Sequence, residues 1–419
     1  MKQKEKSILG NGVASELLSA FNKNHNCPFG EALVEALTLV KKGKPIQAST
    51  LLQQNDHFPL LSLKLCNWTN YFPEQLALSE KLEHVLQELP NSKVKSAKKT
   101  NKKIGIIGSG VCGLNCAKEL ALQGHHVNVY EALAESGGYL RYAVPDMVLP
   151  KDMLNHEIEK LEALGVEFHN THVIGKVMTL DQLESQHHSL FLASGACHPR
   201  LINLKGQHLS NVYYANEYLY RINMMKAHLY PQFKTPVHSA KNTLVVGGGN
   251  MAVYCARLAR SLGNNVTLIY RRSINEMTAL PHEIKKSQDE GVSYVELTGP
   301  RQIKGDEKVE EVQLIQMMLE MEDERGRKNP IPIKDSEFNV EADQVILALG
   351  NVQNPTIFKD SKIRTGFGNK AIVNDQMQTS NEKIFAGGDI VRQSNNLSCA
   401  IRDGRNAATH IHNFLNGKR

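Results

Sequence analysis

Three glycines about a quarter of the way along the chain have the spacing of a dinucleotide-binding turn. Gly108, Gly110 and Gly113 follow the apolar run Ile-Gly-Ile-Ile and precede a stretch with helical spacing. In such a turn the first glycine permits a tight bend, the second lets the backbone approach a pyrophosphate, and the third lets the helix pack on the strand. The pyrophosphate then rests on N–H groups at the positive end of the helix. The segment therefore predicts that an adenine dinucleotide binds here.

An acidic residue ends the next apolar segment of this unit. Glu131 follows the strand pattern His-Val-Asn-Val-Tyr. A carboxylate at this place accepts hydrogen bonds from ribose hydroxyls and repels a 2′-phosphate. The pattern thus predicts FAD or NAD rather than NADP. A lone glycine motif can also be a plain turn, but its position between two strand patterns favours the binding site.

A second glycine motif, Gly-Gly-Gly-Asn-Met-Ala, begins at Gly247 and again follows a strand pattern. The strand pattern after it ends in arginines instead of an acid. Guanidinium groups pair well with phosphate, so this site is predicted to prefer NADP. The alternative, that one or both arginines only cap the exposed end of a strand, stays open. The predicted NADP-binding residues of this motif are Gly247, Gly249, Asn250, Ala252, Arg271 and Arg272.

The two sites together indicate a division of labour between two cofactors. One adenine dinucleotide site has an acidic ribose partner and the other has a basic one, which predicts a flavin enzyme with FAD on the first and NADPH on the second. Hydride passes between the cofactors themselves, and the protein mainly stacks the rings and excludes water. That step requires no side-chain acid, base or nucleophile, so no catalytic residue and no metal site is predicted.

The elements that must position these motifs alternate along the chain. From residue 104, short β-branched runs alternate with helical patterns, which is typical of parallel βαβ units. Two later apolar segments end at Gly350 and at Asp389. Because ligands lie beyond the carboxyl ends of parallel strands, glycines at these ends leave room for a cofactor. The predicted fold class is α/β, with two Rossmann-like dinucleotide-binding domains.

The first part of the chain has a different pattern. The whole chain has 419 residues, which suffice for two or three domains. Residues 1–92 show helical spacing without strand alternation, so a small all-α domain is predicted there. Residues 93–103 contain six lysines and no acid, which indicates a solvated basic linker. Since the formal net charge is +6, the rest of the chain is close to neutral and no basic face for nucleic acid is expected.

The remaining composition argues against export and against the membrane. No apolar run approaches the roughly 18 residues that span a bilayer, and the start lacks the apolar stretch of a signal peptide. The seven cysteines form no Cys-x-x-Cys pair, which suits a reducing compartment. A cytoplasmic location is therefore expected. Cys112 and Cys116, four apart on one helix face, are interpreted as small core residues.

Four longer segments resemble the small-subunit family of glutamate synthase, a module also found in the flavin part of dihydropyrimidine dehydrogenase. The resemblance extends from about residue 100 to the C-terminus. The segments are ESGGYLRYAVPDMVLPKDML from Glu135, LFLASGACHPR from Leu190, YRRSINEMTALP from Tyr270 and IFAGGDIV from Ile384. The resemblance implies that NADPH lies around Gly249 and Arg271. It implies FAD contacts from the segments around Gly108, Glu131, Gly138, Arg141, Gly195 and Asp389.

The resemblance also implies a domain arrangement. The nicotinamide domain, residues 239–350, would be inserted into an FAD domain made of residues 104–238 and 351–419. Gly388 and Asp389 would then return to the FAD site, with Asp389 at the ribityl chain. The helix that starts near Ala400 would point its N-terminus at the flavin ring, where the helix dipole stabilises negative charge. A plain turn residue is the alternative for Asp389.

Two departures from the family matter. Family members hold two iron–sulfur clusters on about eight N-terminal cysteines, whereas residues 1–100 contain only Cys27 and Cys66. Each cubane cluster needs four ligands, mostly thiolates, so no iron–sulfur cluster is expected. In addition, Tyr254 stands where the family usually has an aspartate, which raises the question of how well the nicotinamide site works.

Three functional hypotheses follow from these residues. The leading one is an FAD-dependent oxidoreductase that takes hydride from NADPH and passes electrons from flavin to a partner protein or a small acceptor. The second is a genuine glutamate synthase small subunit. The third is a non-catalytic FAD-binding regulatory or scaffold subunit, which Tyr254 and the missing cluster ligands keep open.

Overall fold

The structure is a computed structural model that divides into two compact units. The first comprises Met1–Leu140, Met147–Ala196 and Gln353–Arg419, and the second comprises Arg141–Asp146 and Cys197–Val352. Among the residues that the structure describes, no helix is both long and apolar enough to cross a membrane. The described residues are 29, 32–65, 76–88, 97–230, 232–233, 237, 240–322, 328–392 and 396–417.

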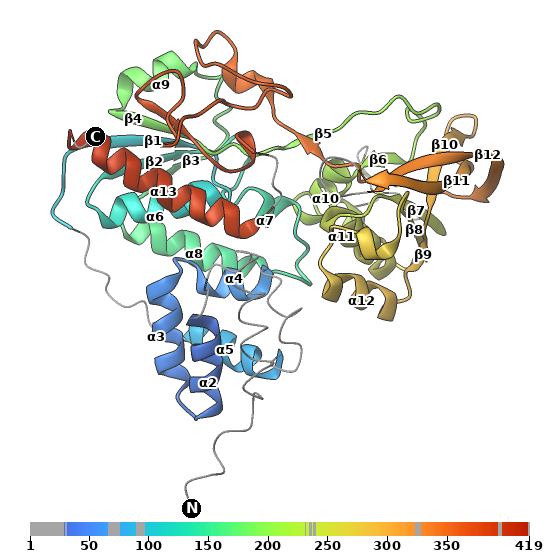
Figure 1. Cartoon of the computed structure of the whole chain (residues 1–419), viewed down its shortest axis with the longest axis horizontal. Helices are drawn as coiled ribbons and strands as arrows, with labels where there is room; N and C mark the ends of the chain where they lie inside the picture. The colour runs from blue at the N-terminus through green and yellow to red at the C-terminus, as the bar shows by residue number, and fades with distance from the viewer. Residues whose placement is uncertain are drawn as a thin grey trace, which may run out of the picture. The chain divides into compact units, whose positions relative to one another are not determined.

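The N-terminal segment forms a small bundle of helices within the first unit (Figure 1). Leucines at helical spacing fill its core, among them Leu33, Leu52 and Leu82, each fully buried. All elements found in the described part of residues 1–92 are helical, as the sequence predicts. Cys27 and Cys66 lie outside the described residues. The helices are α2 (Ala32–Lys41), α3 (Pro45–Asn55), α4 (Pro59–Leu65) and α5 (Leu76–Glu88).

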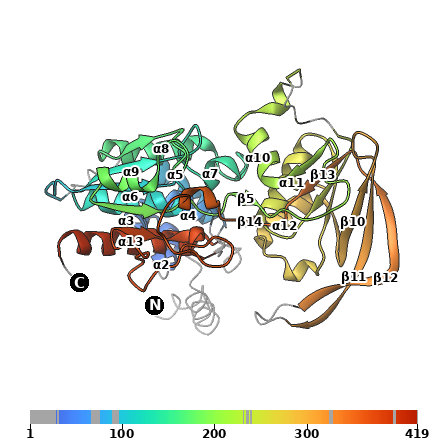
Figure 2. The ribbon, with the colours of Figure 1, turned by 90° about the horizontal axis from the view of Figure 1, so that it is seen from above.

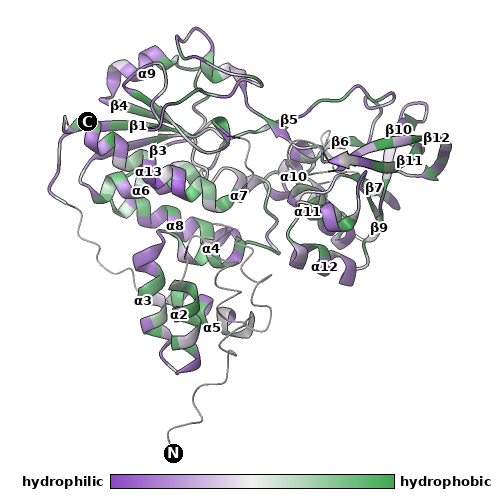
Figure 3. Cartoon of the chain, viewed as in Figure 1, coloured by the Kyte–Doolittle hydropathy of each residue, from purple (hydrophilic) through white to green (hydrophobic). Residues whose placement is uncertain are grey.

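The first unit is built on a five-stranded parallel sheet in the order β15-β4-β1-β2-β3. Strands β1 and β4 are mostly hydrophobic and buried, as Figure 3 shows. The predicted glycine turn follows β1, the central strand. The strands are β1 (Lys103–Ile107), β2 (His126–Tyr130), β3 (Glu167–His169), β4 (Ser189–Leu192) and β15 (Ile384–Ala386).

Helices cover both faces of this sheet. Figure 1 shows α6 and α13 on one side of the strands and α9 on the other. Helix α13 packs closely on α6, because Gly404 brings its backbone against Cys112 and Cys116 of α6. The helical elements of this part of the chain are α6 (Val111–Leu122), α8 (Lys151–Ala163), α9 (Leu180–Gln186), η5 (Pro355–Phe358), η6 (Gly388–Ile390) and α13 (Leu397–Leu415).

The second unit repeats the plan with the sheet order β6-β13-β7-β8-β9, again parallel. The strand before the second glycine motif, β7, is again central. Its strands are β6 (Val212–Tyr214), β7 (Asn242–Val246), β8 (Asn265–Ile269), β9 (Ser293–Val295) and β13 (Gln344–Leu347). Helix α7 (Tyr139–Tyr142) crosses the boundary, since its first two residues belong to the first unit and its last two to the second. The other helical elements of the second unit are α10 (Ala215–Asn223), η3 (Ala227–Leu229), α11 (Asn250–Ser261), η4 (Ile274–Glu276) and α12 (Pro281–Asp289).

A three-stranded antiparallel sheet, which the sequence analysis does not predict, completes the second unit. Its strands are β10 (Thr298–Lys304), β11 (Glu311–Glu322) and β12 (Lys328–Glu341). It packs on the parallel sheet through a shared apolar cluster that includes Ile303, Val312 and Leu314 against Leu244 and Val345. Figure 2 shows these long strands standing apart from α10, α11 and α12.

The inner boundary of the second compact unit differs from the predicted domain boundary by about forty residues. The second unit begins again at Cys197, not at residue 239, because β6 pairs with β13 and α10 packs in the same unit. The segment Arg141–Asp146 also belongs to it. At the other end the unit extends to Val352, two residues past the prediction, since β14 (Asn351–Val352) pairs with β5 (His198–Pro199).

The described part of the predicted linker is ordered by hydrogen bonds. The Ala97 N–H donates to the Leu122 carbonyl at 2.8 Å, and the Thr100 N–H donates to the Gly124 carbonyl at 2.9 Å. Residues from 97 onward therefore line the turn after α6 and lead straight into β1. The lysine-rich composition did not reveal this backbone pairing.

Candidate dinucleotide sites

The three glycines of the first motif occupy three different environments. Gly108 has φ +104°, and a Cβ there would lie 2.5 Å from the carbonyl oxygen of Ala193, the residue that follows β4. A Cβ on Gly110 would meet nothing within 4 Å. A Cβ on Gly113 would collide with the Gly108 carbonyl. These environments match the tight turn, the open approach and the close helix–strand packing that a dinucleotide turn requires.

The N-terminus of α6 is available to a ligand. Gly110 is the residue that precedes its first turn and offers no side chain to cap it. The first N–H groups of a helix lack partners within the helix, so they can donate to phosphate oxygens. Together with the open space at Gly110, this makes the turn a cradle that fits a pyrophosphate.

Glu131 lies at the carboxyl end of β2 and is already part of a hydrogen-bond network. Its Oε2 accepts from the Ser109 N–H at 3.0 Å and from the Ser109 hydroxyl at 2.5 Å, while Oε1 accepts from the Leu133 N–H at 3.0 Å. The Ser109 Oγ in turn accepts from the Gly137 N–H at 2.9 Å. A carboxylate has about four acceptor positions and three are used here, so one remains for a ribose hydroxyl.

Ser109 and Gly137 are site residues that the sequence analysis missed. Ser109 joins the glycine turn to both Glu131 and the loop at Gly137. Gly138 then lies against the turn, because a Cβ on it would be 2.8 Å from the Gly110 Cα. The serine between two glycines was the available signal, since a hydroxyl there can bond the acid at the end of the next strand.

The carboxyl end of β15 leads into the predicted Gly388–Asp389 turn. Gly388 has φ +72° and its N–H donates to the Asp403 carboxylate at 2.9 Å. Asp403, on α13, is 1% exposed and also accepts from Arg392, which holds η6 against the helix. Ala400 lies in the first turn of α13 and is partly exposed. Gly195, with φ +67°, follows β4 in the same unit.

Arg141 is 5% exposed and is grouped with the second unit, as are the residues that follow it. The Asn223 side chain donates to the Tyr142 carbonyl at 3.0 Å, and the Tyr142 ring stacks on Tyr220. This anchoring to α10 was invisible in the sequence, because α10 lies about 75 residues further along the chain.

The second glycine motif has the same geometry at the end of β7. Gly247 has φ +150° and faces the Ala348 carbonyl, and Gly249 precedes α11 without a side-chain cap. Ala252 is fully buried, as a small packing residue should be. Gly248, which the analysis did not single out, lies under the Tyr270 ring, where any side chain would collide.

The loop after β8 folds back on this motif. The Thr278 and Ala279 N–H groups donate to the Gly248 carbonyl at 2.9 and 3.1 Å, and Asn250 Oδ1 accepts from the Leu280 N–H at 2.8 Å. The predicted site residue Asn250 thus positions this loop. Gly350 is exposed, with φ +89°, three residues beyond β13.

The two arginines after β8 have different environments. Arg271 is exposed, while Arg272 is 7% exposed and its Nε donates to the Lys328 carbonyl at 2.8 Å. Only Arg271 is therefore exposed as a phosphate ligand must be; Arg272 is engaged with the antiparallel sheet.

Tyr254 and the cysteines lie inside the protein. Tyr254 is 2% exposed in α11. The five described cysteines are free thiols, and burial raises the pKa of Cys112, Cys116 and Cys255. Thiols of this kind are poor nucleophiles, and Cys112 and Cys116 are core residues as predicted. Within the described residues, no group of His, Cys, Asp and Glu could hold a metal ion.

Comparisons with known proteins agree with this geometry. A family model described as pyridine nucleotide-disulphide oxidoreductase matches residues 102–404. The glutamate synthase [NADPH] small chain of Azospirillum brasilense is 28% identical over 415 residues, covering 94% of this chain and 86% of that protein. The NADP(+)-dependent formate dehydrogenase subunit beta of Moorella thermoacetica is 33% identical over 321 residues, 75% of this chain but only 44% of that subunit.

A solved structure shares the fold. The structure of Mycobacterium tuberculosis FprA in complex with NADPH superposes with a TM-score of 0.65 at 19% identity, covering 76% of this chain and 85% of that one. The predicted resemblance, the α/β fold class and the predicted class of enzyme are confirmed by these matches. The chain belongs to the pyridine nucleotide-disulphide oxidoreductase family.

Proposed function

We propose that this chain binds FAD on its first unit and NADPH on its second, takes hydride from NADPH and passes the electrons to a partner protein or small acceptor. The FAD-binding residues are Gly108, Gly110, Gly113, Glu131, Gly138, Gly195, Gly388, Asp389 and Ala400, to which Ser109 is added. The NADPH-binding residues are Gly247, Gly249, Asn250, Ala252, Arg271 and Gly350. Arg141 stays a proposed FAD contact only through the family resemblance.

The observation that supports this proposal best is the opposite charge at two equivalent places. Glu131 follows β2 and Arg271 follows β8, and each strand is the neighbour of the central strand that ends in a glycine turn. A buried carboxylate suits ribose hydroxyls and repels a 2′-phosphate, whereas an exposed guanidinium attracts it. The same fold therefore holds two different dinucleotides in one chain.

The protein's part in the reaction is binding and orientation. The uncapped N-termini of α6 and α11 donate N–H groups to the pyrophosphates, and Ser109 fixes Glu131 for the ribose. The bound flavin supplies the capacity to accept a hydride and to release electrons. The N-terminus of α13, capped by Asn396, carries positive dipole charge that would stabilise a reduced flavin bound beside it.

The exit of the electrons is also part of the proposal. Residues 1–100 contain two cysteines, too few for the four ligands of one cubane cluster. The flavin itself would then deliver electrons to an accepting subunit, with the helical bundle as a docking domain. A glutamate synthase [NADPH] small chain and an NADP(+)-dependent formate dehydrogenase subunit beta are both similar to this chain. This suits a module that passes electrons to different acceptors. The free thiols are in keeping with the cytoplasmic location.

An anaerobic titration tests the proposal. Flavin absorbance of the purified protein should bleach with NADPH at much lower concentrations than with NADH. Replacement Arg271→Ala should raise the KM for NADPH about tenfold to a hundredfold and leave that for NADH nearly unchanged, because a charged hydrogen bond to phosphate contributes about 1.5–3 kcal/mol. Arg260→Ala, an arginine at the far end of α11, is the matched control.

Each alternative has its own signature. Bleaching by neither nucleotide would favour the regulatory subunit. Co-purification with a large amidotransferase subunit would identify a glutamate synthase small subunit. Stoichiometric iron and sulfide in the pure protein would contradict the absence of a cluster.

A further inference from the structure

The β11–β12 hairpin extends past the carboxyl end of β8, where the second nucleotide is proposed to bind. The Thr298 N–H donates to the Tyr270 carbonyl at 3.0 Å and the Leu297 N–H donates to the Arg272 carbonyl at 3.1 Å. The Met317 N–H of β11 then donates to the Leu297 carbonyl at 2.6 Å. Strand β11 continues for five residues beyond Met317, so the far half of the hairpin runs beyond this edge.

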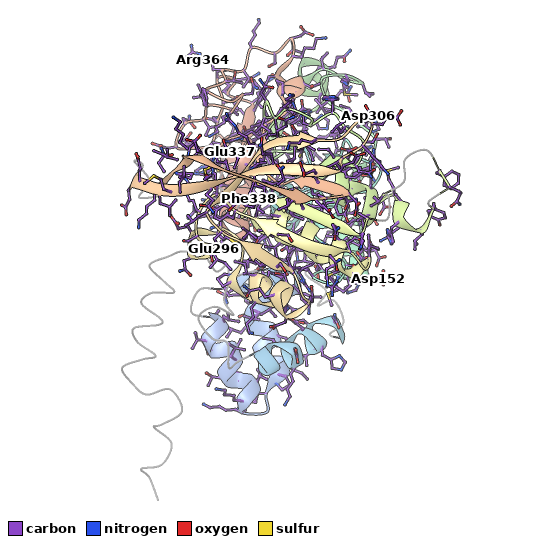
Figure 4. The ribbon with its side chains drawn as sticks, turned by 90° about the vertical axis from the view of Figure 1, so that its right-hand side faces the viewer. Asp152, Glu296, Asp306, Glu337, Phe338 and Arg364 are labelled. Atoms are coloured by element: carbon purple, nitrogen blue, oxygen red, sulfur yellow. The ribbon has the colours of Figure 1, made fainter. Side chains whose placement is uncertain are left out.

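The two ends of the antiparallel sheet can be followed in Figure 4. Glu296, which precedes β10, and Asp306, which follows it, lie at opposite ends of the sheet, with Glu337 and Phe338 of β12 between them. The β10–β11 turn is therefore remote from the end of β8. The start of β12 lies at the same end as Glu296.

Arg272 fastens the hairpin at this end. Its side chain is 7% exposed and donates from Nε to the carbonyl of Lys328, the first residue of β12, at 2.8 Å. A guanidinium holds its donors in a rigid plane, so this contact fixes the backbone of Lys328 against the residue that follows Arg271. The Lys328 side chain is exposed, as is that of Arg271.

We propose that Lys328 is a second cationic contact for the 2′-phosphate of NADPH and that Arg272 is the positioning residue that sets it there. This rests on the proposed function, because it takes NADPH to bind beyond β8. Lysine approaches phosphate as a point charge on a flexible stem, which complements the planar fork of Arg271. The hairpin would thus read the one group that distinguishes NADPH from NADH.

The acidic neighbours limit the size of the effect. Glu296 is held by the Ile274 N–H, which donates to it at 2.7 Å. Glu322 is the cross-strand partner of Lys328 and offsets part of its charge. We therefore expect a contribution nearer to that of an exposed ion pair than to that of a buried one, about threefold to tenfold in affinity.

Calorimetry on the flavin-loaded protein with 2′,5′-ADP and 5′-AMP tests the proposal without requiring turnover. Lys328→Ala should weaken 2′,5′-ADP about threefold to tenfold and leave 5′-AMP unchanged, and Lys328→Arg should restore the affinity. Lys308→Ala is the control, since this exposed lysine lies in the β10–β11 turn at the other end of β11, about 35 Å away at strand rise. In turnover, Lys328→Ala should raise the KM for NADPH and leave kcat unchanged.

The role of Arg272 is tested by combining variants. If Arg272 acts through Lys328, Arg272→Lys and Lys328→Ala together should weaken 2′,5′-ADP no more than the stronger single change. Full additivity would overturn the positioning role. Equal affinity of Lys328→Ala and the unaltered protein would overturn the lysine contact, provided that the unaltered protein prefers 2′,5′-ADP. A protein with no such preference would instead refute the proposed NADPH site.

Discussion

At the scale of single residues, the side chains that follow β2 and β8 differ in charge and in exposure. Glu131 after β2 is buried and Arg271 after β8 is exposed, in keeping with the proposed ribose and phosphate contacts. Arg272 differs, because its buried Nε donates to the Lys328 carbonyl. In the sequence, both adjacent arginines are equally good candidates for a phosphate contact. Only the fold shows that one is exposed and the other is hydrogen-bonded to the antiparallel sheet.

The histidine pair at the turn after α6 predicts an acid-sensitive contact. His125 is 7% exposed, and its Nε2 lies 2.9 Å from Nδ1 of His412 on α13, while Nδ1 contacts the Thr100 hydroxyl at 2.6 Å. Burial, with the His412 and Lys102 charges, lowers the pKa of His125 to about 4. The unfolded chain, with a histidine pKa near 6.5, therefore binds more protons between these values.

Stability should thus fall as pH decreases from about 6.5 to about 4, by at most about 3 kcal/mol from this group. Urea unfolding at pH 7.5 and pH 5 measures it. The His125→Gln variant should show a smaller difference in unfolding free energy between the two pH values. The control His198→Gln, at an exposed position, should show the same difference as the unaltered protein. An unchanged difference in His125→Gln would contradict the assignment; part of it will persist, since burial also lowers the pKa of His187 and His282.

At the scale of elements, the pairing of α6 with α13 links the nucleotide turn to the end of the chain. Gly404 of α13 lies against the backbone of α6, with a Cβ position that would collide with the Cys112 carbonyl and approach the Cys116 nitrogen to 3.1 Å. Asp403, the preceding residue, holds the Gly388 turn. The same crossing therefore positions both the first and the last predicted FAD-binding segments.

Gly404→Ala should destabilise the protein although alanine favours helix. The helix propensity gain is up to about 1 kcal/mol, whereas overpacking against a backbone atom costs about 1–3 kcal/mol. We expect a lower urea midpoint and easier loss of FAD on gel filtration. Gly366→Ala, where a Cβ would have ordinary contacts of 3.7 Å, is the control. A midpoint equal to or above that of the unaltered protein would show that the crossing can relax.

At the scale of the whole molecule, the helical bundle belongs to the first unit and contacts its helices α6 and α13. His57 Nε2 lies 2.8 Å from Glu119, Lys118 donates to the His57 carbonyl and lies 4.7 Å from the Phe58 ring centroid, and Arg405 donates to the Asn55 carbonyl at 2.9 Å. The hydrogen bond from His57 lowers the pKa of Glu119. These contacts hold the described part of the helical bundle on the first unit.

Lys118→Ala should loosen the bundle selectively. Burial lowers the pKa of Lys118, and its removal deletes a charged hydrogen bond and a cation–π contact worth together about 2–3 kcal/mol. Amide hydrogen exchange should accelerate in α3 and α4 but not in β7 and β8 of the second unit. Lys285→Ala, an exposed lysine on α12, is the control. Equal acceleration in both units would mean that the whole fold had been weakened.

The sequence by itself determined the glycine turns after β1 and β7, the opposite charges that follow β2 and β8, and the helical nature of the described N-terminal segment. Glycine turns, strand-end charges and helical spacing are local, because the backbone conformation and the chemistry they specify lie within a few residues. For this reason β1 to β2 and β7 to β8 follow the predicted pattern within one or two residues.

Only the tertiary structure decided which distant segments meet. It assigned residues 197–238 and Arg141 to the second unit, added the antiparallel sheet, and gave Arg272 and Asp403 their partners. Each of these depends on a contact between residues that no local pattern connects: β6 joins β13 across about 130 residues, and Arg272 meets Lys328 across 56. The proposed phosphate contact Arg271 can thus be identified from the sequence, whereas the proposed second contact, Lys328, lies beside Arg272 only because the hairpin folds back on β8.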